Sequence, residues 1–142
     1  MEDIEKAYNN NDFFAGFILA ATYIEYEANQ ILGHLIAERL AMEVLKEWRL
    51  WSKLDCLRRL DLIDCITHQK MEGIIQIRNK LMHPSGIIDK QGRENDLFLR
   101  FRLDENEKSL LLNFKECYSK LIQTDSKLFK EKLGNSKQLK SL

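Results

Sequence analysis

The strongest constraint on the fold is a series of apolar residues near the N-terminus, spaced three or four positions apart. The series comprises Phe17, Ala21, Ile24, Ala28, Ile31 or Leu32, and Leu35. Residues at this spacing share one face of a helix, so the series predicts a long helix with a buried stripe. Asp12 precedes the stripe and has the short acceptor side chain that favours helix N-caps.

Shorter helices are expected on both sides of this stretch. Residues 2–9 are expected to form a leading helix, and helical character is expected to continue over residues 37–51. Ser52 and Asp55 have the spacing of a capping pair, which predicts that a short helix begins there and runs to Leu60.

The next helix ends just before the chain's only proline. Asp64 or Thr67 is expected to cap it, and it is expected to run to about Met82. One apolar side is marked by Ile74, Ile77 and Leu81. Pro84 ends the pattern, because proline disfavours the helical conformation for the residue before it.

After the proline, the composition indicates a loop, and the local sequence favours a small β-hairpin over residues 86–103. Asp104 or Asn106 is expected to cap a last helix, from about residue 107 to residue 132. Gly134 is expected to end that helix, because glycine is common just past a helix C-terminus.

Together these elements predict an all-α bundle of about five helices, with the hairpin as a small addition. At 142 residues the chain fits one domain, expected over residues 1–133 and followed by a flexible tail over 134–142. No apolar run approaches the roughly 18 residues that a membrane-spanning helix needs. The N-terminus is acidic where a secretory signal is basic, so a cytoplasmic protein without a membrane partner is expected.

The three cysteines are too few and too far apart for a disulfide framework. Cys65 and His68 have the spacing of two zinc ligands, with Cys56 nearby, but no fourth ligand is evident. Cysteines within helices are usually small buried apolar residues. We therefore expect neither a metal site nor a cofactor.

The net charge of zero hides an uneven distribution. Residues 1–45 carry two basic and eight acidic side chains, residues 46–102 carry twelve and eight, and residues 103–142 carry eight and six. The middle third is therefore the electropositive part of the chain. It permits a polyanionic partner there, although a bias of this size is also typical of an ordinary solvated surface.

The middle third contains the string Ile77-Arg78-Asn79-Lys80-Leu81-Met82-His83-Pro84, in which Arg78 and His83 have the spacing Arg-x4-His. Asn79 and His83 are four residues apart and therefore share a helix face. At the expected helix C-terminus, the negative end of the helix dipole favours protonated His83. Spacing alone is a weak signal, because a structural arginine that bonds the last helix carbonyls would give the same pattern.

These residue types suit the cleavage of RNA without a metal ion. That reaction needs a base for the 2′-hydroxyl proton or an acid for the leaving oxygen, and a histidine can serve as either. It also needs a fixed cation near the phosphorus, and the planar fork of arginine matches phosphate oxygens. Asn79 could orient His83 or contact the phosphate. One copy of the motif supplies a single histidine, so an acid and a base together require a second copy.

The string from Ile77 to Pro84, late in a helical domain of about this size, resembles the signature of HEPN domains (higher eukaryotes and prokaryotes nucleotide-binding). The segment from Leu60 to Ile63, with a helix between it and the motif, is similar to their usual layout, as is the long first helix that carries Glu25. The resemblance covers roughly residues 12–130, and its specificity depends on Arg78, Asn79 and His83.

The resemblance implies an all-α bundle that forms a homodimer, with two Arg-x4-His motifs in one composite cleft. Many HEPN proteins are metal-independent endoribonucleases of toxin–antitoxin, phage-defence or CRISPR-associated systems. By this analogy Arg78 and His83 would be catalytic, and Asn79 and Lys80 would support substrate binding. One toxin subgroup has a tyrosine two residues after the histidine, which its antitoxin modifies. Ser85 occupies that position here, which argues against that form of regulation.

Two other interpretations stay open. The chain could be a non-catalytic helical regulator that binds a nucleotide or a protein, similar to the mannitol operon repressor family, which carries a related Arg-Asn-x3-His. It could also be the toxin half of a pair whose activity an antitoxin masks. His34 and His68 lack comparable surroundings and are expected to be surface or partly buried helix residues.

Overall fold

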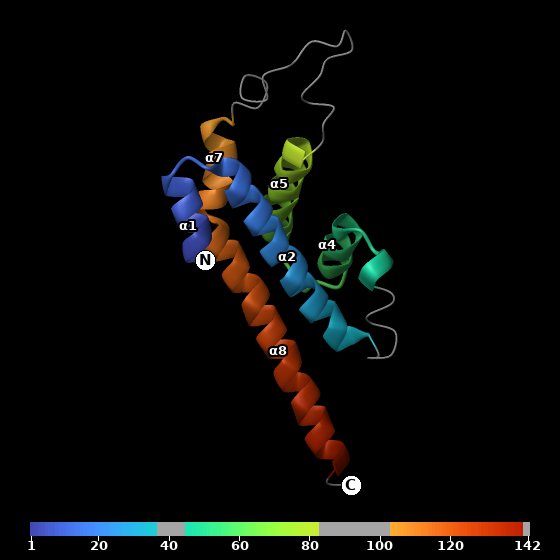
Figure 1. Cartoon of the computed structure of the whole chain (residues 1–142). Coiled ribbons are helices and arrows are strands. Elements are labelled where there is room, and N and C mark those ends of the chain that lie inside the picture. The colour runs from blue at the N-terminus through green and yellow to red at the C-terminus, as the bar shows by residue number, and fades with distance from the viewer. Residues whose placement is uncertain (37–44, 83–102, 141–142) are drawn as a thin grey trace. The chain divides into compact units, whose positions relative to one another are not determined.

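A computed structural model of the chain describes residues 1–36, 45–82 and 103–140, with side chains described as far as residue 134 (Figure 1). Each regular element in these ranges is an α-helix, and no strand occurs there, which confirms the prediction of an all-α fold. The helices with defined bounds are α1 (Glu2–Asn9), α2 (Phe13–Leu35), α4 (Leu50–Arg59), α5 (Cys65–Met82), α7 (Glu105–Leu112) and α8 (Phe114–Lys140).

The helices belong to two compact units. The first unit comprises Met1–Thr22 and Lys70–Lys115, and the second comprises Tyr23–Gln69 and Glu116–Leu142. Helices α2, α5 and α8 each contribute residues to both units. The prediction of one domain over 1–133 stays a prediction.

The first unit has its own apolar core, made by α1, the beginning of α2, the later part of α5, α7 and the first residue of α8. Its fully or nearly fully buried side chains are Ile4, Ala7, Phe17, Ala20, Ala21, Met71, Ile74, Ile75, Ile77, Leu111 and Phe114. Gly16 allows α2 to approach α7 closely, because a Cβ atom there would lie 2.7 Å from Cδ1 of Leu111. The close approach explains why this position on α2 has no side chain.

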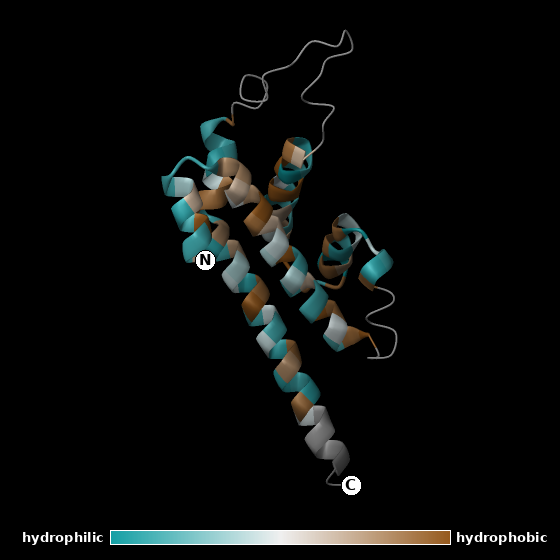
Figure 2. Ribbon diagram, viewed as in Figure 1, coloured by the Kyte–Doolittle hydropathy of each residue, from teal (hydrophilic) through white to brown (hydrophobic). Residues whose placement is uncertain are grey.

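The second unit has a separate core. Its buried apolar side chains are Ile24, Ala28, Ile31, Leu32, Leu50, Leu54, Leu57, Ile63, Cys117 and Leu121. The residues from α2 include most of the stripe that the spacing predicts, so the long helix near the N-terminus is confirmed. The prediction is wrong for Leu35, the last residue of the stripe, which is 47% exposed at the end of α2. Apolar and polar residues alternate along the coloured parts of the helices (Figure 2).

Three helix N-termini are capped by the aspartates that the sequence indicates. Asp12 Oδ1 accepts from the backbone N–H of Ala15 at 3.2 Å. Asp64 Oδ1 accepts from the backbone N–H of Thr67 at 2.7 Å, just before α5 begins. Asp104 forms a complete capping box with Glu107 at the start of α7. Each cap supplies an acceptor for a helix N–H that has no partner within the helix.

The prediction that Ser52 and Asp55 form a capping pair at the start of a helix is wrong. Helix α4 begins at Leu50, with Arg49 as its N-cap, so Ser52 lies inside the helix. Burial of Leu50 and other apolar side chains of α4 favours the earlier start. The Asp55 carboxylate pairs with His68 at 3.0 Å instead of closing a capping box.

The last predicted helix is wrong in two respects. It is interrupted at Asn113, the C-cap of α7, so two helices replace one. Asparagine is a weak helix former because its side chain competes for backbone hydrogen bonds. Gly134 does not end α8, which continues to Lys140. Glycine costs a helix only about 1 kcal/mol relative to alanine, and Glu131, Lys132 and Leu133 before it are strong helix formers.

Other predicted features lie outside the described residues. They are the helical character of residues 37–44, the end of the motif helix at Pro84, and nearly all of the hairpin over residues 86–103. Within the part of the chain that the structure describes, no helix is both long enough and apolar enough to cross a membrane.

Gly33 gives a direct test of how much helix propensity contributes to stability. It lies within α2, and a Cβ atom added there would meet no described atom within 4 Å. We expect Gly33→Ala to stabilise the protein by about 0.5–1 kcal/mol, because alanine loses less backbone entropy in a helix. Thermal unfolding followed by circular dichroism would show a higher midpoint. Gly16→Ala is the matched control, and an equal gain there would contradict the packing of α2 on Leu111.

Candidate functional site

The first candidate site is the C-terminal end of α5, where the motif residues Arg78, Asn79 and Lys80 lie in the first unit. The apolar residues beside them anchor this end of the helix, since Ile74, Ile75 and Ile77 are buried. Arg78 and Asn79 are half-buried, and Lys80 is exposed. The helix therefore presents a cation and an amide at the border between core and solvent.

A hydrogen bond fixes the guanidinium of Arg78. Its Nε–H donates to Oδ1 of Asn79 at 2.9 Å. Within the described part of the chain, Asn79 is the only hydrogen-bond partner of this guanidinium, and no carboxylate pairs with it. No described residue contacts the two terminal nitrogens of the fork, and a guanidinium fork has the geometry that suits two oxygens of a phosphate.

The expectation that Asn79 orients His83 or contacts a phosphate stays a prediction, and the structure shows a contact of its side-chain oxygen with Arg78. That oxygen accepts from Arg78, so Asn79 positions the arginine. His83 and Pro84 lie outside the described residues, so the structure does not test the pairing of Arg78 with His83. The sequence did not predict the Arg78–Asn79 bond, although the two residues are adjacent.

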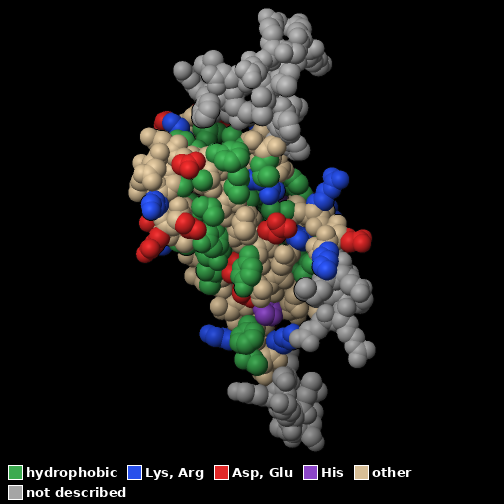
Figure 3. Space-filling model, viewed as in Figure 1, with side chains coloured by type: hydrophobic (Ala, Val, Ile, Leu, Met, Phe, Trp, Pro, Cys, Tyr) green, Lys and Arg blue, Asp and Glu red, His purple; other side chains and the backbone are tan. Residues whose placement is uncertain are grey.

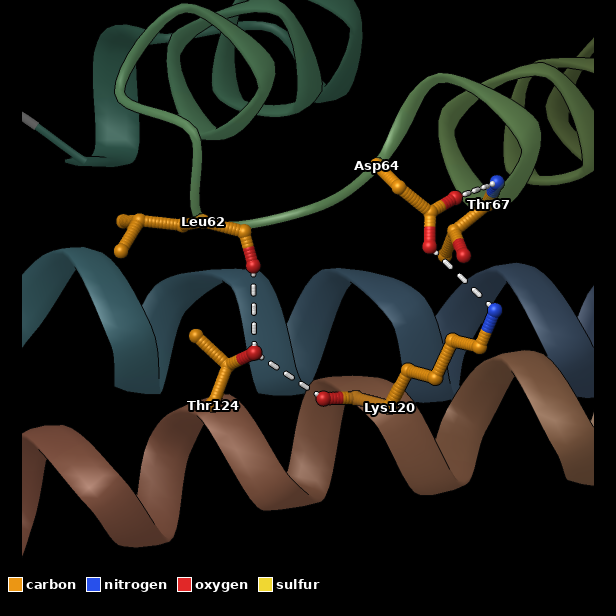
Figure 4. A network of polar contacts seen from close by, with 5 residues as sticks. All are labelled: Leu62, Asp64, Thr67, Lys120 and Thr124. Atoms are coloured by element: carbon orange, nitrogen blue, oxygen red, sulfur yellow. Dashed lines mark hydrogen bonds and ion pairs between the residues drawn. The ribbon is translucent and has the colours of Figure 1, made fainter.

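A second polar cluster surrounds the start of α5 in the second unit (Figure 4). The Asp64 carboxylate caps the helix through Thr67 and accepts from the Lys120 ammonium of α8 at 3.2 Å. The Thr124 hydroxyl donates to the backbone carbonyl of Leu62 at 3.1 Å. These contacts hold the turn before α5 against α8.

The environment of Asp64 stabilises its charged form. The hydrogen bond from the Thr67 backbone, followed by the Thr67 side chain and Lys120, lowers the pKa of Asp64 to about 2. A pocket of about 310 Å³ lies beside it and is lined by Leu62, Ile63, Asp64, Thr67, Lys120, Gln123, Thr124 and Lys127. The residues that line the pocket carry charges of both signs. Asp64 and Lys120 neutralise each other in an ion pair, so their presence is explained by the contact between the turn before α5 and α8.

The two described histidines are each paired with an aspartate, which the sequence did not predict. His34 Nε2 lies 2.5 Å from Asp125 Oδ1, and His68 Nε2 lies 3.0 Å from Asp55 Oδ1. Both imidazoles are partly buried, as expected. The His68 pair offers two groups of the kinds that bind metal ions. Cys65, which has the spacing of a zinc ligand relative to His68, is exposed and interacts with Arg58.

Sequence reasoning also missed a buried polar group in the second unit. Tyr118 on α8 donates to Oε1 of Glu27 on α2 at 3.3 Å. Glu27 is 7% exposed although it lies on the apolar side of α2. The partners are 91 residues apart, so no local pattern could have indicated the contact.

Searches of protein-family models, of curated proteins and of solved structures found no match to this chain.

Proposed function

We propose that the protein is a metal-independent endoribonuclease that cleaves single-stranded RNA at a cleft containing Arg78 and His83. The observation that supports it most is the Arg78 guanidinium, held by Asn79 and without any other partner among the described residues. An arginine kept only for structure would be expected to bond the last carbonyls of the helix. Among the described residues Arg78 makes no such bond, and a guanidinium fork matches two oxygens of a phosphate.

The proposed reaction is a transfer within the RNA backbone. His83 takes the proton of a 2′-hydroxyl, and the 2′-oxygen forms a bond to the adjacent phosphorus. The bond between phosphorus and the 5′-oxygen then breaks, and a protonated group supplies a proton to that oxygen. The products are a 2′,3′-cyclic phosphate and a 5′-hydroxyl. Arg78 stabilises the negative charge that builds up on the phosphoryl oxygens.

A homodimer would supply the two histidines that this scheme uses, one as base and the other as acid. Asn79 positions Arg78, and Lys80, which is exposed one residue further on, would add charge attraction for the RNA backbone. A toxin or phage-defence role, with an antitoxin or another protein as partner, accords with such an activity.

The proposal is tested by incubating the purified protein with a mixture of single-stranded RNAs in excess EDTA. We expect fragments that end in a cyclic phosphate, and intact RNA after long incubation would contradict the proposal. RNA bound without cleavage, with an affinity that falls steeply as salt increases, would favour the non-catalytic regulator instead.

A further inference from the structure

The second unit contains a group of four polar side chains that the proposed ribonuclease site does not use. Glu27 and His34 belong to α2, and Tyr118 and Asp125 belong to α8. The Tyr118 hydroxyl donates to Oε1 of Glu27, and His34 Nε2 contacts Asp125 Oδ1. These contacts link the two helices at positions seven residues apart on each of them.

The four side chains do not supply enough hydrogen-bond donors. Oε2 of Glu27 is buried and has no hydrogen-bond partner among the described residues. The neighbouring side chain is that of Asp125, whose charge and hydrogen bonding act on Glu27. Two ionised carboxylates cannot bond each other, because neither has a hydrogen to donate. A buried carboxylate oxygen without a donor is costly, so one hydrogen is missing from this arrangement.

We infer that Glu27 holds a proton in the folded protein and forms, beside Asp125, a buried proton-binding site between α2 and α8. The proton joins the unpartnered Oε2 of Glu27 to the Asp125 carboxylate. His34 then pairs with Asp125, and Tyr118 donates to the other oxygen of Glu27. The buried Oε2 of Glu27 is satisfied in this state.

Among the described residues, the basic side chain that contacts the pair of Glu27 and Asp125 is His34, which lies against Asp125. On α2 the nearby titratable groups are Tyr23 and Tyr26 besides His34, and on α8 the facing group is Tyr118. Lys53 on α4 pairs with Glu25, at 3.6 Å, and Lys120 on α8 pairs with Asp64. Among the described residues, no lysine or arginine forms an ion pair with Glu27 or Asp125.

The titration of Glu27 has a defined sign. Burial, followed by the charge and hydrogen bonding of Asp125, raises the pKa of Glu27 above its ordinary value of 4.5. Burial and the Glu27 carboxylate raise the pKa of Tyr118 to about 12, so this donor keeps its hydrogen at neutral pH. The stability that the proton contributes is complete below pH 4.5 and is lost as pH rises through the raised pKa of Glu27. Packing of α8 on α2 therefore strengthens as the medium becomes more acidic.

The inference is tested by urea unfolding of the wild type and of Glu27→Gln at a series of pH values from 4.5 to 8. The amide of glutamine carries its own hydrogens and mimics the protonated acid. We expect the two proteins to be closest in stability near pH 4.5. Above it, the wild type should lose stability relative to the variant, by up to about tenfold in the unfolding constant per pH unit.

Glu131→Gln makes the same change on the exposed side of α8 and should follow the wild type at every pH. A ratio of unfolding constants between wild type and Glu27→Gln that is independent of pH would overturn the inference. Carbon-13 NMR of the Glu27 carboxyl in the wild type needs no variant. It should show a titration midpoint above 4.5, and a midpoint at or below 4.5 would also overturn it.

Discussion

Replacement of Arg78 by alanine is expected to slow RNA cleavage by roughly 100- to 1000-fold, the loss typical when one donor to a developing negative charge is removed. The guanidinium is the only described cation of the motif that a hydrogen bond holds in place. Single-turnover cleavage of a labelled RNA in EDTA would measure the effect. Arg78→Lys keeps the charge but loses the fork, so it should recover only part of the rate.

Arg59→Ala is the matched control for this prediction. Arg59 is exposed in the last turn of α4, in the other unit, and lies outside the proposed site. The Arg59→Ala variant should cleave RNA at the wild-type rate. Because Arg78 is half-buried, the unfolding midpoints of all three variants should be compared with that of the wild type. Equal rates for Arg78→Ala and wild type would remove Arg78 from the mechanism.

The largest loss of stability is expected for Phe17→Ala. Phe17 is fully buried in the core of the first unit. Truncating a buried phenylalanine costs about 3–5 kcal/mol, because the apolar contacts are lost and a cavity remains. For a chain of this size the thermal midpoint should fall by roughly 10–20 °C. Thermal unfolding followed by circular dichroism measures the change.

Phe14→Ala controls for the loss of a phenyl ring from the same helix. Phe14 lies one turn away on α2 and is 50% exposed, so its truncation should cost less than about 1 kcal/mol. Similar losses for the two variants would contradict the orientation of α2.

Several large apolar side chains are exposed as Phe14 is, and charged side chains lie among them on the surface (Figure 3).

The sequence predicted those parts of the fold that depend on residues close together in the chain. Each capping aspartate accepts from a backbone N–H three residues later in the chain, so the caps at Asp12, Asp64 and Asp104 are visible as local patterns. The apolar stripe of α2 is visible for the same reason. Ser52 shows the limit of such patterns, because burial of Leu50 moved the start of α4 to an earlier residue.

The polar contacts between helices could not be predicted. Glu27 and Tyr118 are separated by 91 residues, as are His34 and Asp125, and neither pair has a distinctive spacing. A glutamate on the apolar side of α2 was a signal that a polar partner must exist, but it could not identify that partner. In the motif, residue types alone predicted an anion site at Arg78, and the hydrogen bond from Arg78 to Asn79 became visible only in the structure.

We propose above all that the protein cleaves RNA by attack of the RNA 2′-hydroxyl on the adjacent phosphorus, with His83 as the group that takes the proton. The most direct measurement compares one RNA oligonucleotide with its all-2′-deoxy counterpart in excess EDTA, each incubated with the wild type and with His83→Ala. We expect that only the wild type cuts, that it cuts only RNA, and that one product ends in a cyclic phosphate. Cleavage of the deoxy strand, or equal cleavage of RNA by His83→Ala, would contradict it.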